Sequence, residues 1–157
     1  MERQKKTRKL TLTGIMIALG TVLSFVPIWQ MPLGGTVTLL SMIPIVCLTV
    51  LYGMKWGFYS CFIYSVLQLI IGVIKNGILG WGLSTASLIG TVLLDYIIAY
   101  SVIALSGIFR KKGTLGIAVG VAIAVTLRFL CHFLSGAIIF DIWCEWDSVW
   151  LYSLCYN

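Results

Sequence analysis

Residues 84–109 read STASLIGTVLLDYIIAYSVIALSGIF, an apolar run with a single charged side chain, Asp95. A helix needs about 20 mainly apolar residues to cross the hydrocarbon core of a bilayer, and this run is long enough. Further apolar windows lie at residues 10–28, 37–52, 56–74 and 114–140, and a shorter one lies at 148–157. The sequence therefore predicts an all-α integral membrane protein, a single transmembrane domain over residues 1–157 with five full helices and the start of a sixth.

The composition is that of a membrane protein and excludes an ordinary soluble domain. The chain has 157 residues, of which 60% are hydrophobic, with a mean hydropathy of +1.03 and a formal charge of +6. Its basic clusters stand next to predicted helix ends, where they set the topology and contact anionic lipid, so nucleic-acid binding is not expected. The five cysteines form neither a disulfide framework nor a zinc-site spacing. We expect no metal and no cofactor.

The charges that flank the helices predict the orientation of the bundle. The basic cluster at residues 3–9, Lys55 and the run 110–112 fall on one side of the membrane, and Lys75 falls alone on the other. By the positive-inside rule, the amino terminus is then cytoplasmic. The longer connections face outward, at residues 27–36, 75–83 and 141–150.

Three ionisable residues lie inside predicted helices, where a charge is costly enough to mark a functional position. From the helix rise, Asp95 lies about 16 Å below the outer surface, His132 about 12 Å and Arg128 about 18 Å. The three side chains can therefore meet at one level. Gly136 follows His132 by four residues on the same helix face and leaves room above the imidazole for a flat ring.

Two interpretations of this cluster are open. In the first, Asp95 and Arg128 neutralise each other as a buried pair, and His132 is a hydrogen-bonded neighbour. In the second, at least one of them faces an outward-opening cavity with a polar or cationic ligand, reached past Ser87 and Thr91. The second is favoured by a carboxylate, an imidazole with space above it and aromatic side chains near the mouth, because together these attract a cationic heterocycle.

The chain has no evident energy source of its own. It lacks a G-x-x-x-x-G-K-[ST] motif for ATP, and Asp95 is its single intramembrane carboxylate, whereas proton-driven carriers usually have several. It then either conducts passively or captures a ligand and leaves transport to partners. Gly14 and Ala18 give the first helix a small-x-x-x-small strip, which either docks a partner helix or packs inside its own bundle. No nucleophile or metal set accompanies Asp95, so an enzyme is not expected.

Five segments occur in a recognisable order: GGTVTLLSMIP at 34–44, YGMKWG at 52–57, LDYIIAY at 94–100, RFLCHFLSG at 128–136 and WLYSLCYN at 150–157. In this order they resemble the thiamine-specific S component (ThiT, YuaJ type) of energy-coupling factor transporters. The R-x-x-C-H-x-x-x-G segment is the most specific part of the resemblance, and the first segment is shared more loosely with other S components.

The resemblance implies a six-helix protein of the bacterial cell membrane that binds thiamine from outside. It also implies work with a transmembrane coupling subunit of the EcfT type and two ATPase subunits. The ligand contacts that it implies are Asp95, Tyr96, His132, Gly136, Tyr152 and Asn157, with Tyr64 and either Phe140 or Trp143 as the nearest further aromatic positions. The docking positions that it implies are Gly14 and Ala18.

Two departures from the family pattern bear on the expected pocket. Family members carry a full sixth helix after the asparagine that matches Asn157, where this chain ends. Phe140 stands where some relatives place a stacking tryptophan, so Trp143 is the alternative for that role. Arg128 is assigned to tuning Asp95 or to structure. The remaining alternatives are an S component for hydroxymethylpyrimidine or riboflavin, and a small passive channel.

Overall fold

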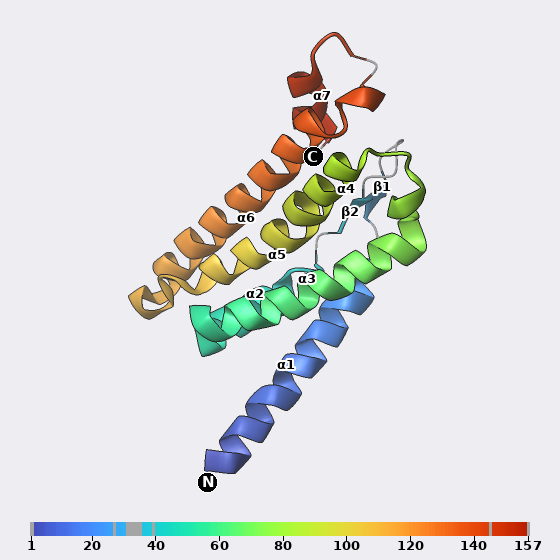
Figure 1. The fold of residues 1–157 in the computed structure, drawn as a ribbon. Coiled ribbons are helices and arrows are strands. Elements are labelled where there is room, and N and C mark those ends of the chain that lie inside the picture. The colour runs from blue at the N-terminus through green and yellow to red at the C-terminus, as the bar shows by residue number, and fades with distance from the viewer. Residues whose placement is uncertain (1, 27, 31–35, 39, 145, 157) are drawn as a thin grey trace.

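The computed structural model describes residues 2–26, 28–30, 36–38, 40–144 and 146–156, which form helices and one short strand pair joined by turns and short connections (Figure 1). The longer helices are α1 (Glu2–Ser24), α2 (Ile43–Tyr52), α3 (Met54–Asn76), α6 (Gly113–Ile138) and α7 (Val149–Tyr156). Before α6 the chain forms α4 (Thr85–Thr91), the π-helix η2 (Val92–Ile98), α5 (Ala99–Ser101) and the 3-10 helix η3 (Val102–Gly107). The remaining elements are β1 (Trp29–Gln30), β2 (Thr36–Val37) and the short 3-10 helices η1 (Ile78–Gly80), η4 (Arg110–Lys112) and η5 (Asp141–Trp143). The predicted helical class is confirmed.

Among the described residues, two helical stretches are long and apolar enough to cross a membrane: α3 over Met54–Lys75, and the stretch Thr85–Ile138. The second folds back on itself, so that the arm from α4 to η3 and the arm formed by α6 run side by side (Figure 1). The reversal ends at Gly113, whose φ of 73° is a conformation that glycine adopts without strain. α2 is also apolar but shorter.

Small residues allow these two arms to approach closely. Gly116, Gly120 and Ala124 follow one another at four-residue intervals on α6, and all three are buried. A Cβ at Gly116 would lie 2.5 Å from the carbonyl oxygen of Phe109, and one at Gly120 would lie 2.6 Å from that of Ser106. The arms therefore meet backbone to backbone, which is the usual way for apolar helices to associate in lipid.

Some element boundaries differ from those predicted. The window 37–52 is helical only over Ile43–Tyr52, because Thr36–Val37 pairs antiparallel with Trp29–Gln30 and Pro44 lies in the first turn of α2. The first helix begins at Glu2 rather than near residue 10, since the basic residues ahead of the apolar window also favour a helix. The window 84–109 consists of several short helical segments instead of one regular α-helix.

The core lies where α1, α2, α3 and η3 meet. Tyr64 is its largest fully buried side chain, and its hydroxyl donates to the carbonyl oxygen of Gly20 at 3.1 Å. The hydroxyls of Thr49 and Ser106 hydrogen-bond to each other and join α2 to η3. This packing holds the amino-terminal helices against the arm that contains Asp95.

The two ends of the bundle have different connections (Figure 1). The β1–β2 pair and the connections after α3 and α6 gather at one end, whereas the α2–α3 turn and η4 lie at the other. At this second end, the ammonium of Lys9 lies 3.9 Å from the centroid of the Trp56 ring. The indole N–H of Trp56 donates to the hydroxyl of Thr13 at 2.9 Å. The two contacts fasten α1 to the start of α3.

Candidate functional site

Asp95 belongs to the arm from α4 to η3, and both oxygens of its carboxylate contact side chains of α6. Its Oδ1 is 2.9 Å from Nδ1 of His132, and its Oδ2 accepts a 2.6 Å hydrogen bond from the hydroxyl of Ser135. His132 and Ser135 are three residues apart and therefore share one face of α6. We call Asp95, His132 and Ser135 the Asp95 cluster.

The Asp95 cluster is sheltered but still accessible. The side chain of Asp95 is 15% exposed and that of His132 is 25% exposed, whereas Ser135 is fully buried. An ionised carboxylate has about four acceptor positions, so its two present contacts leave acceptor capacity. A ligand with a positive charge or an N–H donor can therefore bind the carboxylate while the carboxylate keeps its hydrogen bond from Ser135.

The backbone that carries Asp95 is a π-helix. Val92–Ile98 adopts this geometry between the α-helical turns of α4 and α5. A π-helix has wider turns than an α-helix, and such segments are rare and frequently coincide with functional sites. The wider turn sets the direction in which Asp95 and its neighbour Tyr96 leave the helix.

Arg128 does not pair with Asp95. Its guanidinium donates to the carbonyl oxygen of Ala99 at 3.3 Å and lies 4.0 Å from the centroid of the Tyr100 ring. The interpretation in which Asp95 and Arg128 neutralise each other is therefore wrong, because Asp95 contacts Nδ1 of His132 and, among the described residues, forms no salt bridge with an arginine. Arg128 instead joins α6 to the opposite arm through a cation–π contact.

A row of tyrosines adjoins the Asp95 cluster. Tyr96 stacks on Tyr100 with 6.5 Å between the ring centroids, and Tyr100 meets the edge of Tyr64 at 5.4 Å. Tyr96 fits against α3 because position 72 is glycine: a Cβ at Gly72 would collide with the Tyr96 hydroxyl. Tyr64 is fully buried, so it supports this row from the core.

Aromatic side chains meet at the end of the bundle that holds the connections after α3 and α6. Phe140 meets Trp81 edge to face, with 5.9 Å between the ring centroids. Tyr152, which is 9% exposed, meets Trp146 in the same way at 5.8 Å. The first pair joins the connection after α3 to the connection after α6, and the second joins the latter connection to α7.

The structure describes the other predicted site positions less completely. Gly136 is buried on α6, one turn beyond His132. The side chain of Trp143 and the whole of Asn157 lie outside the described part of the chain. In the predicted polar track toward Asp95, the buried hydroxyl of Thr91 donates to the carbonyl oxygen of Ser87 at 3.0 Å, so it is satisfied by its own helix.

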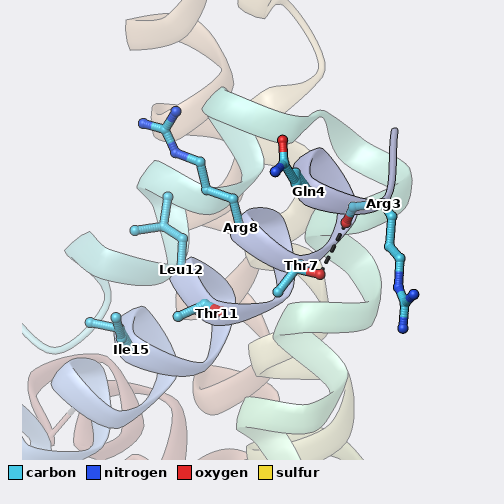
Figure 2. Close-up of a pocket in the computed structure, with 7 residues that line it drawn as sticks. All are labelled: Arg3, Gln4, Thr7, Arg8, Thr11, Leu12 and Ile15. Carbon is cyan, nitrogen blue, oxygen red and sulfur yellow. Dashed lines mark hydrogen bonds between the residues drawn. The ribbon is translucent and has the colours of Figure 1, made fainter. Parts of the chain in front are cut away.

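The described residues form concave surfaces along α1 and beside η4, both away from the Asp95 cluster. The first, of about 650 Å³, runs along α1 from Arg3 to Ile15, and all of its lining residues come from this one helix (Figure 2). A surface built by one helix has no opposite wall and does not enclose a ligand. The second, of about 420 Å³, lies where the α2–α3 turn faces η4.

The predicted docking strip lies on the exposed side of α1. Gly14 and Ala18 are both exposed, and a Cβ at Gly14 would meet nothing within 4 Å. In contrast, a Cβ at Gly20 would lie 2.9 Å from the carbonyl oxygen of Ser41, so Gly20 packs inside the bundle. The positions of Gly14 and Ala18 leave room for another helix.

Sequence reasoning missed two residues of the site. Ser135 is three residues after His132, a spacing that places both on one helix face, but a serine in an apolar run gives no indication of its partner. Tyr100 follows Tyr96 by four residues, and its contact with Arg128 was not predicted. Among the described residues, no group of three or more His, Cys, Asp or Glu side chains is arranged to hold a metal ion.

Comparisons with known proteins agree on one family. The family model described as "Thiamine transporter protein (Thia_YuaJ)" matches residues 10–157. A protein described as thiamine transporter ThiT, from Bacillus subtilis (strain 168), is 31% identical over 172 residues, an alignment that covers 100% of this chain and 84% of that protein. A solved structure of ThiT from Listeria monocytogenes has a TM-score of 0.70 at 23% identity and covers 98% of this chain and 84% of its own, which shows the same fold.

Proposed function

This chain belongs to the thiamine transporter family, and on that premise we propose that it captures thiamine at the outer face of a bacterial cell membrane. In this proposal it passes the vitamin to a transmembrane coupling subunit of the EcfT type, which two ATPase subunits drive. The chain is a transporter component and not an enzyme. In this proposal the bundle has five membrane segments, of which α2 is the shortest, α7 is the start of a sixth, and the amino terminus is cytoplasmic.

The observation that carries this proposal is the Asp95 cluster. Thiamine has a permanent thiazolium charge and an aminopyrimidine ring with hydrogen-bond donors. Asp95, already fixed by His132 and Ser135, offers a preorganised carboxylate to the charge or to the amino group. Because the side chain of Asp95 is only 15% exposed, the attraction is stronger than it would be in water.

The aromatic and polar neighbours would bind the rest of the ligand. His132 would stack on a ring of the vitamin near Gly136, with Phe140 or Trp143 on the outer side. Tyr96, Tyr152 and Asn157 would take the remaining hydrogen bonds. Tyr64 would contribute through Tyr100, whose ring it contacts at 5.4 Å. The Trp81–Phe140 contact would help the outer connections to cover the bound vitamin.

The coupling subunit would pack against α1. Gly14 and Ala18 are exposed small residues, so a partner helix can approach the backbone of α1 closely. This surface is on the opposite side of α1 from Gly20, which packs against Tyr64 in the core. Docking there would leave the Asp95 cluster undisturbed.

The decisive test is a titration of the detergent-purified chain with thiamine, followed by tryptophan fluorescence. We expect saturable quenching by thiamine and none by riboflavin or hydroxymethylpyrimidine. Asp95→Asn should weaken thiamine binding by at least about tenfold, about 1.4 kcal/mol, because the amide lacks the negative charge. The matched control is Glu2→Gln, which removes one negative charge at the exposed start of α1.

Other results of these measurements would indicate a different ligand, a different site or a different function. Quenching by riboflavin or hydroxymethylpyrimidine alone would identify an S component for that vitamin. Unchanged thiamine affinity in Asp95→Asn would remove Asp95 from the ligand site. Thiamine flux through liposomes that contain this chain without ATPase partners would indicate a passive channel.

A further inference from the structure

The concave surface between the α2–α3 turn and η4 is lined by cations and has no acid on its rim. Its volume is about 420 Å³, within the size range of small-molecule sites. Lys55, Arg110, Lys111 and Lys112 line it together with Gly53, and no acidic residue does. None of the four cations forms an ion pair with a described carboxylate. Their charge is therefore available to an anion.

Arg110 is fixed in this surface by the backbone of α2. Its guanidinium donates to the carbonyl oxygens of Val50 at 3.2 Å and Leu51 at 2.8 Å. It also lies across Gly53, where a Cβ would be 3.0 Å from the guanidinium carbon. A guanidinium has five N–H donors, so these two contacts leave donors for a ligand while the group stays in place.

The start of α3 adds a second source of positive potential. α3 begins at Met54, and the preceding Gly53 provides no side-chain cap. The first amides of a helix have no partner inside the helix and favour an anion. Gly53, Met54 and Lys55 all line the concave surface, so these amides and the basic side chains act on the same space.

The apolar part of the rim indicates which anion fits. Met54 is 43% exposed and Ile108 is 46% exposed, and both line the same surface as the cations. Cations next to exposed apolar side chains, at the end of helices long enough to cross a bilayer, match a phosphate attached to acyl chains. A free phosphate would use the cations but not the apolar rim.

We propose that this surface, formed by Gly53–Lys55 and Gly107–Lys112, is a binding site for the phosphate headgroup of an anionic phospholipid. Arg110 and the start of α3 hold the phosphate, Lys55 and Lys111 surround it, and Met54 and Ile108 contact the acyl chains. The site lies at the opposite end of the bundle from the outer connections, and it does not depend on the proposed thiamine function.

The test measures lipid binding to the full chain in detergent by native mass spectrometry. The probes are phosphatidylglycerol and phosphatidylcholine with identical acyl chains, each titrated with and without inorganic phosphate. We expect tighter binding of phosphatidylglycerol, with little displacement by an equal concentration of phosphate. Lys55→Gln/Lys111→Gln should weaken phosphatidylglycerol binding by about tenfold or more, given a contribution of about 1 kcal/mol for each basic residue near a charged lipid.

The matched control is Lys5→Gln/Lys6→Gln, which removes the same charge from the exposed start of α1 and should weaken phosphatidylglycerol binding much less, because these lysines do not line the concave surface. Equal loss in the two double variants would overturn the site, because net charge alone would then explain the binding. Equal binding of the two lipids would also overturn it, as would displacement by inorganic phosphate. The thermal unfolding of the same samples, followed by circular dichroism, shows that each variant is folded, and a thiamine titration tests the proposed function separately.

Discussion

Ser135 shows how a small residue can determine the geometry of a charged one. Its buried hydroxyl holds Oδ2 of Asp95 at 2.6 Å, while His132 contacts the other oxygen. With both oxygens fixed, the carboxylate keeps one orientation before any ligand arrives. Less conformational freedom is then lost on binding, which is the general advantage of a preorganised site.

We therefore predict that Ser135→Ala weakens thiamine binding by about fivefold to tenfold, about 1 to 1.4 kcal/mol, since a hydrogen bond to a charged group is lost. The effect should be smaller than that of Asp95→Asn, because the carboxylate and His132 remain. The measurement is the same fluorescence titration. Ser65→Ala is the matched control: Ser65 is also fully buried, but its hydroxyl donates to the carbonyl oxygen of Phe62. Equal losses in both variants would mean that Ser135 acts only through packing.

At the scale of the helices, hydrophobic runs predicted where elements lie but not their internal geometry. Residues 84–109 and 114–140 were predicted as two helices, and the structure folds them into two adjacent arms. The π-helix at Val92–Ile98 was not predictable from hydropathy, since a hydrophobic run does not specify the hydrogen-bond spacing inside it. This explains why the sequence predicts Asp95 as a candidate site residue but not its hydrogen-bond partner Ser135. A carboxylate inside an apolar run is conspicuous because burying its charge is costly, whereas only the backbone geometry determines which hydroxyl lies next to it.

The exposed strip of α1 gives a prediction at the same scale. Gly14→Leu should leave folding and thiamine affinity unchanged, because a side chain there meets nothing within 4 Å in this chain. It should reduce co-purification with the coupling subunit and ATP-dependent thiamine uptake by about tenfold, since a bulky residue keeps a partner helix away. Gly14→Ala retains a small side chain and should behave like the wild type. Normal uptake with Gly14→Leu would place the docking surface elsewhere.

At the scale of the whole molecule, the two ends of the bundle differ in the charge of their residues. The Trp81–Phe140 and Trp146–Tyr152 pairs and the acidic residues Asp141 and Asp147 lie at the end with the connections after α3 and α6, which we call the aromatic end after these pairs. The basic residues of η4 lie at the other end. The Asp95 cluster lies between them, closer to the aromatic end, because His132 is only six residues before the end of α6. Capture from outside therefore requires that the aromatic end face the exterior, which the positive-inside rule predicts.

This orientation can be tested in intact cells with a thiol reagent that does not cross membranes. Asp147→Cys, in the exposed connection before α7, should be labelled directly, whereas Lys6→Cys, on the exposed start of α1, should be labelled only after the cells are permeabilised. Both positions are exposed in the chain, so a difference in labelling reports the side of the membrane and not burial. The wild-type chain, with its five native cysteines, provides the background. Direct labelling of Lys6→Cys and protection of Asp147→Cys would reverse the bundle, and the Asp95 cluster would then open toward the cytoplasm, where it could not capture an external vitamin.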